Sequence, residues 1–298
     1  MAEAQPSVYL IDGSSYIFRA FFALPPLTNA AGLPTHAIYG FTNMTIRFIK
    51  QYRPEYLAVV LDAGRETFRN EIYEAYKANR PEAPPQLIPQ FPYIRKVLQA
   101  LKLPLLEMRG FEADDIIGTL AKTFSSQGIK VVVVSGDKDL MQLVADGIRL
   151  LDSAKGKWIG LEEIKQKFGV EPQRVTEVMG LMGDSVDNIP GVKGIGEKTA
   201  TALIQKFGTL ENLFERLEEV ETSGLKGAAR IRKALTEGKE IAFLSRELAT
   251  VKRDVPVQTD LADLRYRAPD IENLRALFAE LEFHNLLKTL DEPELEQR

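Results

Sequence analysis

The sequence predicts an α/β fold with a mostly parallel central sheet flanked by helices, followed by a helical subdomain. Three short apolar segments are rich in β-branched residues and show no polar alternation: 8–11 (VYLI), 56–61 (YLAVVL) and 130–134 (KVVVV). Parallel strands that are covered on both faces have this pattern. Helical patterns separate the three segments, and no strand pattern follows about residue 160.

The helical patterns between the strands cover residues 36–53, 93–102 and 114–124. Five prolines in residues 80–92 (RPEAPPQLIPQFP) break any preceding helix and favour an exposed connection. We therefore expect an α/β core over residues 7–171 and a helical subdomain over residues 172–298.

The composition restricts the kinds of metal site that this chain can build. The chain has 298 residues, 45% of them hydrophobic, which is enough for a sizeable core. It has no cysteine and only two histidines, His36 and His284, which excludes disulfides and thiolate zinc sites and leaves little for an imidazole site. Any metal must therefore be held by oxygen ligands.

The charge and the N-terminus bear on partners and location. The net charge of -4 argues only weakly against a polyanionic partner, because local basic patches bind phosphates. The N-terminus has no cationic lead into an apolar stretch, and no apolar run approaches membrane-spanning length. We expect a cytoplasmic protein with no membrane partner.

An aspartate follows each predicted strand: Asp12, Asp62 and Asp137. In open α/β sheets, ligands bind outside the carboxyl ends of the strands, so these side chains are expected to converge at one edge. More carboxylates accompany them in the segments GFEADD and SGDKD. The expected acidic set is Asp12, Asp62, Glu112, Asp114, Asp115, Asp137 and Asp139.

Two interpretations of these carboxylates compete. Each aspartate alone is explained as a helix N-cap, which contributes about 1 kcal/mol. As a set they would repel one another and raise their pKa values, unless cations lie among them. Oxygen-only sites suit Mg²⁺ or Mn²⁺. Asp184 and Asp187 flank a turn that local hydrogen bonds explain as well, so only the other carboxylates make them candidate ligands.

The chain resembles the 5′-nuclease (flap endonuclease) family, which includes the N-terminal 5′-3′ exonuclease domain of bacterial DNA polymerase I. The matching stretches occur in family order over about residues 7–290: YLIDGSSYIFRAFFA, VVLDAGRETFRNEIYEAYKANRP, GFEADDIIGTLA, VVVVSGDKDLMQLV and LMGDSVDNIPGVKGIGEKTA. The resemblance implies a PIN-like nuclease core, a helical arch at about 64–92 and a helix-hairpin-helix at about 185–207.

The resemblance also implies two divalent ions, Mg²⁺ or Mn²⁺, held by all nine carboxylates. Two such ions activate water and stabilise the leaving oxygen, so no histidine base is needed. The first ion is expected near Asp62, Glu112, Asp114 and Asp115, and the second near Asp137, Asp139, Asp184 and Asp187.

A second cluster is suited to phosphate. The residues Arg65, Arg69, Tyr73, Tyr76, Lys77 and Arg80 recur at three- and four-residue spacing, so a helix would align them. A solvated face with glutamate ion pairs is the common alternative. The resemblance implies that this segment forms the arch, with Lys77 and Arg80 as catalytic cations. Arg19, on the first helix, is a further candidate for a phosphate contact.

The glycine-rich segment 189–207 (IPGVKGIGEKTATALIQKF) reads as a helix-hairpin-helix. A helix C-cap followed by a turn is the plain alternative. The resemblance implies binding to the duplex backbone and a K⁺ ion held by hairpin carbonyls. The candidate DNA-binding residues are Gly191, Gly194, Gly196, Lys198 and Thr199.

The predicted function is that of a structure-specific, monomeric 5′-nuclease in DNA replication and repair. Its expected partners are DNA with a 5′ flap, a nick or a single-strand/duplex junction, together with RNA/DNA primer junctions. Two alternatives stay open: a PIN-like metal-dependent ribonuclease and a non-catalytic DNA-junction-binding protein. The sequence does not rank exonuclease against flap endonuclease activity, or a stand-alone protein against a domain of a polymerase.

Overall fold

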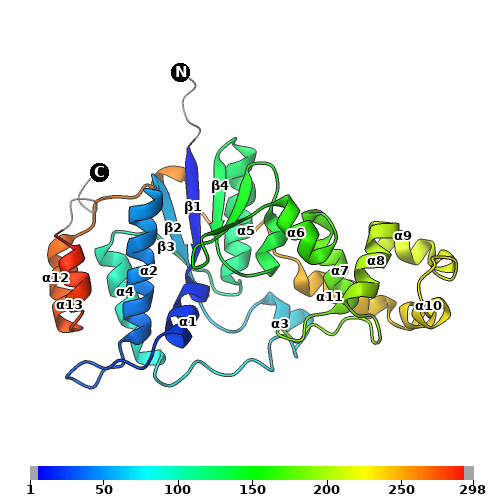
Figure 1. The fold of residues 1–298 in the computed structure, drawn as a ribbon, viewed down its shortest axis with the longest axis horizontal. Helices are drawn as coiled ribbons and strands as arrows, with labels where there is room; N and C mark the ends of the chain where they lie inside the picture. The colour runs from blue at the N-terminus through cyan, green and yellow to red at the C-terminus, as the bar shows by residue number, and fades with distance from the viewer. Residues whose placement is uncertain (1–5, 292–298) are drawn as a thin grey trace.

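A computed structural model describes residues 6–291, and Figure 1 shows its arrangement. A six-stranded sheet has the order β3-β2-β1-β4-β5-β6, and every neighbouring pair is parallel except β5 and β6. The strands are β1 Ser7–Asp12, β2 Tyr56–Val60, β3 Leu105–Leu106, β4 Lys130–Val134, β5 Ile148–Asp152 and β6 Lys157–Ile159. The three predicted strands are the central part of this sheet.

Helices cover both faces of the sheet, which explains why the strand segments are apolar throughout. Ile11 and Val132 point into one core, which contains side chains of α1, α2 and α4. Leu10 and Val133 point into the opposite core with α5. These helices are α1 Gly13–Ala23, α2 His36–Tyr52, α4 Phe91–Ala100 and α5 Ala113–Ser126, so the three predicted helices are confirmed to within two residues.

The chain becomes helical after β6, as predicted, and extends away from the sheet as the lobe on the right of Figure 1. Side chains such as Val178, Leu203 and Leu210 join the same core as α5. The helices of this region are α6 Leu161–Phe168, α7 Val175–Met182, α8 Glu197–Phe207, α9 Leu210–Glu215, α10 Ala228–Glu237 and α11 Lys239–Ala249.

The last two helices, α12 Ile271–Glu280 and α13 His284–Thr289, return to the opposite side of the molecule. Phe278 and Leu286 are buried in the core that α2 and α4 share. The region expected as one helical subdomain therefore does not pack as one unit, because these apolar side chains complete the α/β core. Its residues 292–298 lie outside the described part of the chain.

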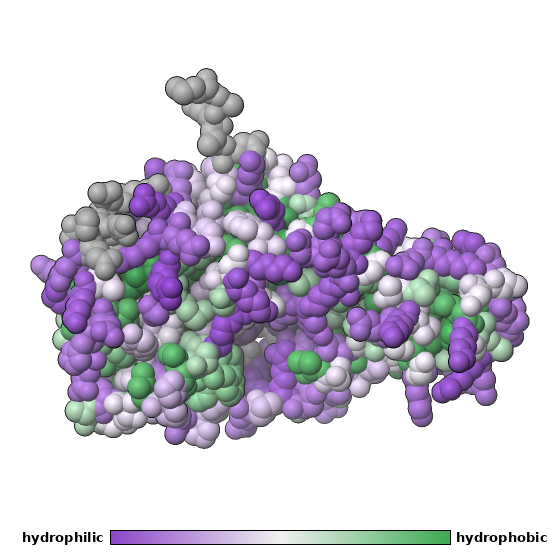
Figure 2. Space-filling model, viewed as in Figure 1, coloured by the Kyte–Doolittle hydropathy of each residue, from purple (hydrophilic) through white to green (hydrophobic). Residues whose placement is uncertain are grey.

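The surface in the view of Figure 2 is mainly hydrophilic, and it is hollowed between the sheet-bearing body and the helical lobe. Within residues 6–291, no helix combines the length and the apolar character needed to span a bilayer.

Candidate active site

The carboxyl ends of the central strands face an acidic cavity of about 240 Å³. Ser14, Ser15 and Phe18 from the first helix also line it. The structure brings seven of the nine predicted carboxylates to this cavity: Asp12, Asp62, Glu112, Asp114, Asp137, Asp139 and Asp187. The order of the sheet explains the meeting, because β1 lies between β2 and β4.

Asp12 caps a helix and also lines the cavity, so the N-cap and the metal-site interpretations of this residue are compatible. The backbone N–H of Ser15 donates to its Oδ1 at 2.9 Å, which caps α1, and the Ser135 hydroxyl donates to its Oδ2 at 2.7 Å. Burial nevertheless raises the pKa of Asp12 to about 6, and the charges of Asp137 and Asp62 add to the effect.

The start of α5 brings further carboxylates to the cavity. Asp62 Oδ1 accepts a hydrogen bond from the Ala113 N–H at 2.8 Å, which ties the end of β2 to this helix. Asp114, in the first turn, projects into the cavity. Its pKa lies well above the ordinary value because of desolvation and the charges of Asp12 and Asp137. Negative charge therefore accumulates here beyond what capping requires.

The residues of this cavity fit a hard divalent cation. Asp139 Oδ1 is buried and has no hydrogen-bond partner, which is costly unless a cation satisfies it. Burial, followed by the charge of Asp137, raises the pKa of Asp139 to about 7. The donors are carboxylate and hydroxyl oxygens, the ligands that Mg²⁺ and Mn²⁺ prefer.

Cationic side chains lie between several of the carboxylates. Lys77 Nζ lies 2.7 Å from Glu112 Oε1 and 3.6 Å from Asp187 Oδ2. Arg80 pairs with Asp187, and Lys138 Nζ lies 2.5 Å from Asp184 Oδ2. Within the described chain, no three acidic or imidazole side chains form a preformed metal cage. The lysines and arginines provide the neutralising charge in this arrangement.

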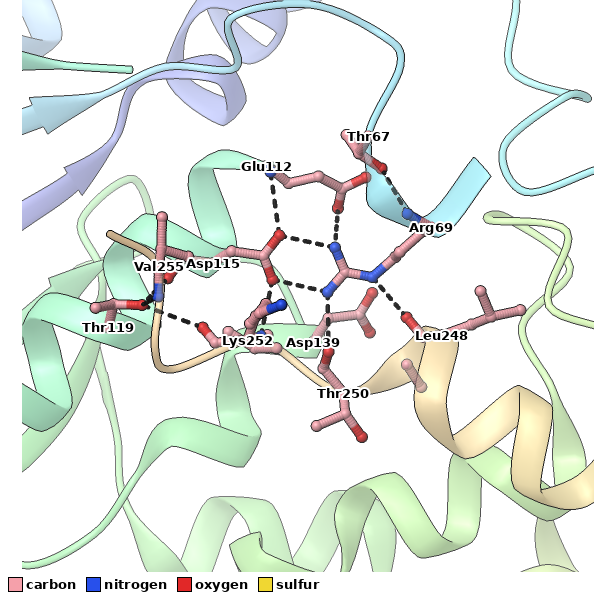
Figure 3. A network of polar contacts seen from close by, with 12 residues as sticks. Thr67, Arg69, Glu112, Asp115, Thr119, Asp139, Leu248, Thr250, Lys252 and Val255 are labelled. Carbon is pink, nitrogen blue, oxygen red and sulfur yellow. Dashed lines mark hydrogen bonds and ion pairs between the residues drawn. The ribbon is translucent and has the colours of Figure 1, made fainter. Parts of the chain in front are cut away.

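Asp115 lies behind the cavity, and Figure 3 shows why it does not match the prediction of a metal ligand. Its carboxylate is 0% exposed and forms two hydrogen bonds of 2.8 Å with the Arg69 guanidinium. The backbone N–H groups of Glu112 and Lys252 also donate to it, at 3.1 Å and 2.8 Å. These donors occupy both oxygens, so the carboxylate is a structural anchor in this arrangement.

Arg69 is likewise placed away from the DNA-facing surface that the sequence suggested. Its side chain is buried, and it donates to the carbonyl oxygens of Leu248 and Thr250 at 2.9 Å and 2.8 Å. The guanidinium therefore joins the segment after β2, the start of α5 and the end of α11, as Figure 3 shows. Desolvation acts to lower the pKa of Arg69, but the bonds and charge of Asp115 raise it above its usual range.

The continuous helix expected for the cationic stripe is wrong. Helix α3 covers only Phe68–Ile72, and Tyr73 has extended dihedral angles. Beyond it, the chain turns so that the buried Tyr76 donates to Glu112 Oε2 at 3.3 Å. Lys77 has a φ of 55°, a left-handed conformation that costs about 1–2 kcal/mol for a non-glycine residue. The ion pairs of Lys77 with Glu112 and Asp187 offset this cost, so the chain leaves the helical conformation that its residue spacing favours.

The remaining members of the stripe have different environments. Arg65 is exposed and donates to the Arg80 carbonyl at 2.8 Å, while Tyr73 is partly buried against the core. Lys77 and Arg80 both line the acidic cavity. The segment between α3 and α4 crosses below the carboxyl ends of the strands in Figure 1, and it contains turns and the short 3₁₀ helix Ile88–Gln90 in place of one continuous helix.

The loop after α7 holds Asp184 and Asp187 against this segment. The N–H groups of Asp184 and Ile189 each donate to the other residue's carbonyl, at 2.9 Å and 2.8 Å, which closes the loop. The Lys77 N–H donates to the Asp187 carbonyl at 3.0 Å, and Asn188 Nδ2 donates to the Ala75 carbonyl at 2.6 Å. The helical region thus reaches the acidic cavity through this loop.

The predicted hairpin lies between α7 and α8, and its glycines differ in role. Gly191 has a φ of 61°, and a Cβ on it would lie 2.4 Å from the Gly183 nitrogen, so it is required for backbone packing. It is buried, unlike Gly194, Gly196 and Lys198, which are exposed. A Cβ on Gly194 or Gly196 would meet nothing within 4 Å, so their backbone is open to a ligand.

Sequence reasoning missed three contributors near the cavity. The Ser135 hydroxyl donates a hydrogen bond to the Asp12 carboxylate and accepts one from the Asp137 backbone N–H. Lys138 neutralises Asp184, and its position between two candidate aspartates was the available signal. Asp152 ends β5, a strand that the sequence did not indicate because Arg149 interrupts its apolar run.

Comparison with known proteins covers nearly the whole chain. A family model described as "5'-3' exonuclease, N-terminal resolvase-like domain" matches residues 7–169, and one described as "5'-3' exonuclease, C-terminal SAM fold" matches residues 170–272. The 5'-3' exonuclease of Aquifex aeolicus is 41% identical over 285 residues, which are 96% of this chain and 95% of that protein.

DNA polymerase I of Bacillus caldotenax is 42% identical over 97% of this chain but only 33% of its own length. This chain therefore spans about a third of the polymerases that it matches. Among solved structures, T5 5'-exonuclease with bound zinc has a TM-score of 0.66 at 22% identity and covers 95% of this chain and 98% of its own. This structural similarity supports the α/β fold with its helical region.

Both halves of the chain match 5'-3' exonuclease models, and the Aquifex relative matches along nearly its full length. The acidic cavity at the strand ends, the adjoining lysine and arginine, and the hairpin between α7 and α8 all lie within the matched residues. The chain belongs to the 5'-3' exonuclease family.

Proposed function

We propose that this chain is a structure-specific 5′-nuclease that hydrolyses DNA phosphodiesters with two divalent cations, Mg²⁺ in the first place. The observation that carries the proposal is the cavity lined by seven carboxylates, with Lys77 and Arg80 on its wall. Membership of the 5'-3' exonuclease family supports the reaction type.

The divalent cations, when bound, supply an activated water and stabilise the charge on the leaving oxygen. The seven carboxylates that line the cavity are the proposed groups that hold them, whereas Asp115 and Asp184 lie outside this lining. Asp139 Oδ1, which lacks a hydrogen-bond partner, is the strongest single support. Neither histidine lines the cavity: His36 is buried beside Phe21, and His284 starts α13.

Lys77 and Arg80 are proposed to bind the scissile phosphate and stabilise negative charge in the transition state. Both now pair with carboxylates that a divalent cation would neutralise. Binding of metal and phosphate would therefore exchange partners, with carboxylates facing the cations and the two side chains facing the phosphate. Burial acts to lower the pKa of Lys77, but the charge of Glu112 raises it above its ordinary value. This supports a Lys77 side chain that stays positively charged.

DNA is the proposed partner, contacted through phosphates rather than base edges. Gly194, Gly196, Lys198 and Thr199 are proposed to bind a duplex backbone, and a K⁺ ion is proposed at the hairpin carbonyls. The exposed Gly194 and Gly196, which leave room for a ligand, support this placement. Arg19 and Arg65 are proposed phosphate contacts. We further propose that the chain acts as a cytoplasmic monomer in replication and repair, on flaps, nicks and primer junctions.

The test is digestion of a 5′-flap duplex, a nicked duplex, a single strand and an RNA flap, with and without Mg²⁺, with product sizes read on a gel. Metal-dependent cleavage near the DNA junction is the expected result. Asp137→Asn is expected to abolish it without loss of junction binding, whereas Asp146→Asn, an exposed aspartate outside the cavity, keeps full activity.

Two outcomes would contradict the proposal. Preferential cleavage of the RNA flap would favour a PIN-like ribonuclease. Binding of the flap without metal-dependent cleavage, in a folded protein, would favour a non-catalytic junction-binding protein.

A further inference from the structure

A fourth strand-end carboxylate, Asp152, faces basic side chains instead of the acidic cavity. Its side chain is buried at the end of β5. Arg19 Nη1 lies 3.2 Å from its Oδ1, and Lys155 Nζ lies 3.2 Å from its Oδ2. Burial acts to raise the pKa of Asp152, but the Lys155 hydrogen bond and the charge of Arg19 outweigh it, so the pKa is below its ordinary value.

The turn that carries Lys155 is fixed to the first helix. The Lys155 N–H lies 3.2 Å from the Asp152 carbonyl and 3.3 Å from Asp152 Oδ1, and the hydroxyls of Tyr16 and Ser153 form a hydrogen bond. Although its backbone is held, the Lys155 side chain is 75% exposed. The Lys155 side chain is thus accessible from solvent, while Asp152 holds both its ammonium and its backbone.

This turn adjoins the acidic cavity. A Cβ on Gly136, the residue before Asp137, would lie 2.5 Å from Arg19 Nη2 and 3.2 Å from Asp152 Oδ2. The pair of Arg19 and Asp152 therefore packs directly on the loop that leads from β4 to the cavity.

Lys167 lies on α6, which packs against β6, the strand that follows the turn of Lys155. Among the described residues Lys167 has no carboxylate partner, and its ammonium lies 5.5 Å from the centre of the Phe168 ring. Burial and then the charge of Lys138 lower its pKa, while the charges of Asp137 and Asp139 act to raise it, and the lowering effect of Lys155 is smaller. Lys165, two residues earlier, pairs instead with Glu171 at 3.2 Å.

We propose that Lys155 and Lys167 contact backbone phosphates of the nucleic-acid strand that passes the acidic cavity, and that Asp152 is a positioning residue for Lys155. The proposal rests on the proposed nuclease function. Both lysine side chains are exposed beside the cavity, and Lys167 has no ion-pair partner among the described residues, so both can bind the phosphates of a polyanion. Because the contacts are to phosphate, they do not depend on base sequence.

The test compares Lys155→Ala, Lys167→Ala and their double variant with the matched control Lys165→Ala, which removes a similar charge from α6. Fluorescence anisotropy in EDTA gives Kd for a 5′-flap duplex between about 50 and 200 mM salt. The double variant is expected to flatten the slope of log Kd against log salt by about 1.8, since each lost phosphate contact removes about 0.9. The control keeps the wild-type slope. Equal slopes for the double variant and the control would overturn the proposal.

The Asp152→Asn variant distinguishes a positioning role of Asp152 from the effect of its negative charge on DNA binding. Removal of a negative charge near DNA would tighten binding if only net charge mattered. If Asp152 positions Lys155, the Asp152→Asn variant is expected to bind the flap duplex more weakly than wild type. The same substitution is expected to have no effect on binding in a Lys155→Ala background. Tighter binding by this variant would refute the positioning role, while the lysine variants still test the contact surface.

Cleavage by the wild-type protein keeps the two proposals distinguishable. Single-turnover cleavage at saturating protein is expected to be within about twofold of wild type for the Lys165→Ala control, because Lys165 pairs with Glu171 outside the proposed contact surface. If the wild-type protein fails to cleave flap DNA in Mg²⁺, the nuclease proposal fails, whatever the salt slopes show.

Discussion

Replacement of Arg69 by leucine is expected to destabilise the whole chain, although Arg69 was first identified as a candidate DNA contact. The substitution removes both hydrogen bonds to Asp115, which is 0% exposed, and leaves that carboxylate without its cationic partner. It also leaves the carbonyl oxygens of Leu248 and Thr250 without their side-chain donor. Arg69→Leu thus removes the link that connects three distant segments.

The expected magnitude follows from the burial of this pair. Loss of one partner of a buried ion pair costs about 3–5 kcal/mol, because the other charge stays desolvated and uncompensated. For a chain of this size, the loss corresponds to a decrease in Tm of about 10 °C. Arg65→Leu is the matched control, since Arg65 lies on the same segment, is exposed and donates only to the Arg80 carbonyl. Its expected cost is within about 0.5 kcal/mol.

Urea denaturation followed by circular dichroism measures both variants, and isothermal titration with Mn²⁺ measures metal binding. Asp115→Asn is expected to lose stability as Arg69→Leu does, whereas Asp114→Asn is expected to lose metal affinity while it keeps stability. Equal stability of Arg69→Leu and Arg65→Leu would contradict the anchoring role of the Arg69–Asp115 pair. The same role is also contradicted if Asp115→Asn loses metal affinity with no loss of stability, because Asp115 would then be a metal ligand.

Three further predictions concern the cavity and the hairpin. Lys77→Ala is expected to slow single-turnover cleavage about 100-fold or more, as one preorganised charge is lost, and an unchanged rate would remove Lys77 from the mechanism. Asp12 and Asp139, with pKa values of about 6 and 7, hold protons more tightly when folded than when unfolded. Their ionisation therefore destabilises the metal-free chain as pH rises from about 4 to 7, and Mg²⁺ relieves this repulsion. The Tm increase caused by Mg²⁺ should consequently be larger at about pH 8 than at about pH 6 by scanning fluorimetry, and equal increases would contradict it. Gly191→Ala is expected to destabilise the chain strongly because its Cβ would lie 2.4 Å from a backbone nitrogen, whereas Gly194→Ala costs about 1–2 kcal/mol and weakens duplex binding. A stable Gly191→Ala protein that binds duplex poorly would reverse these roles.

The sequence predicted the parts of the fold that depend on local patterns. Apolar segments such as 130–134 became central strands, and Asp137 followed its strand into the cavity. Short strands were not predictable in this way: β3 has only two residues, and β6 pairs antiparallel at the sheet edge. Their hydrogen bonds depend on neighbours that are distant in sequence.

The errors in the site have one physical cause. Helical spacing suggested that Arg69 and Tyr76 share an exposed face, but spacing contains no information about burial. Arg69 instead pairs with Asp115 and Tyr76 turns to Glu112, because tertiary ion pairs and hydrogen bonds override local helix preference. Asp12, Asp62 and Asp137 were correctly expected to meet, since sheet topology brings strand ends together. The start of α5 and the loop after α7 add three of the other four carboxylates, and the fourth, Asp139, closely follows Asp137 in the chain.

Anomalous diffraction from crystals soaked in Mn²⁺ would locate the metal ions directly. Two manganese peaks about 4 Å apart are expected among the cavity carboxylates, which include Asp12, Asp114 and Asp139, with none beside Asp115. Well-ordered crystals with no manganese density among these side chains would contradict the proposal of a two-cation site.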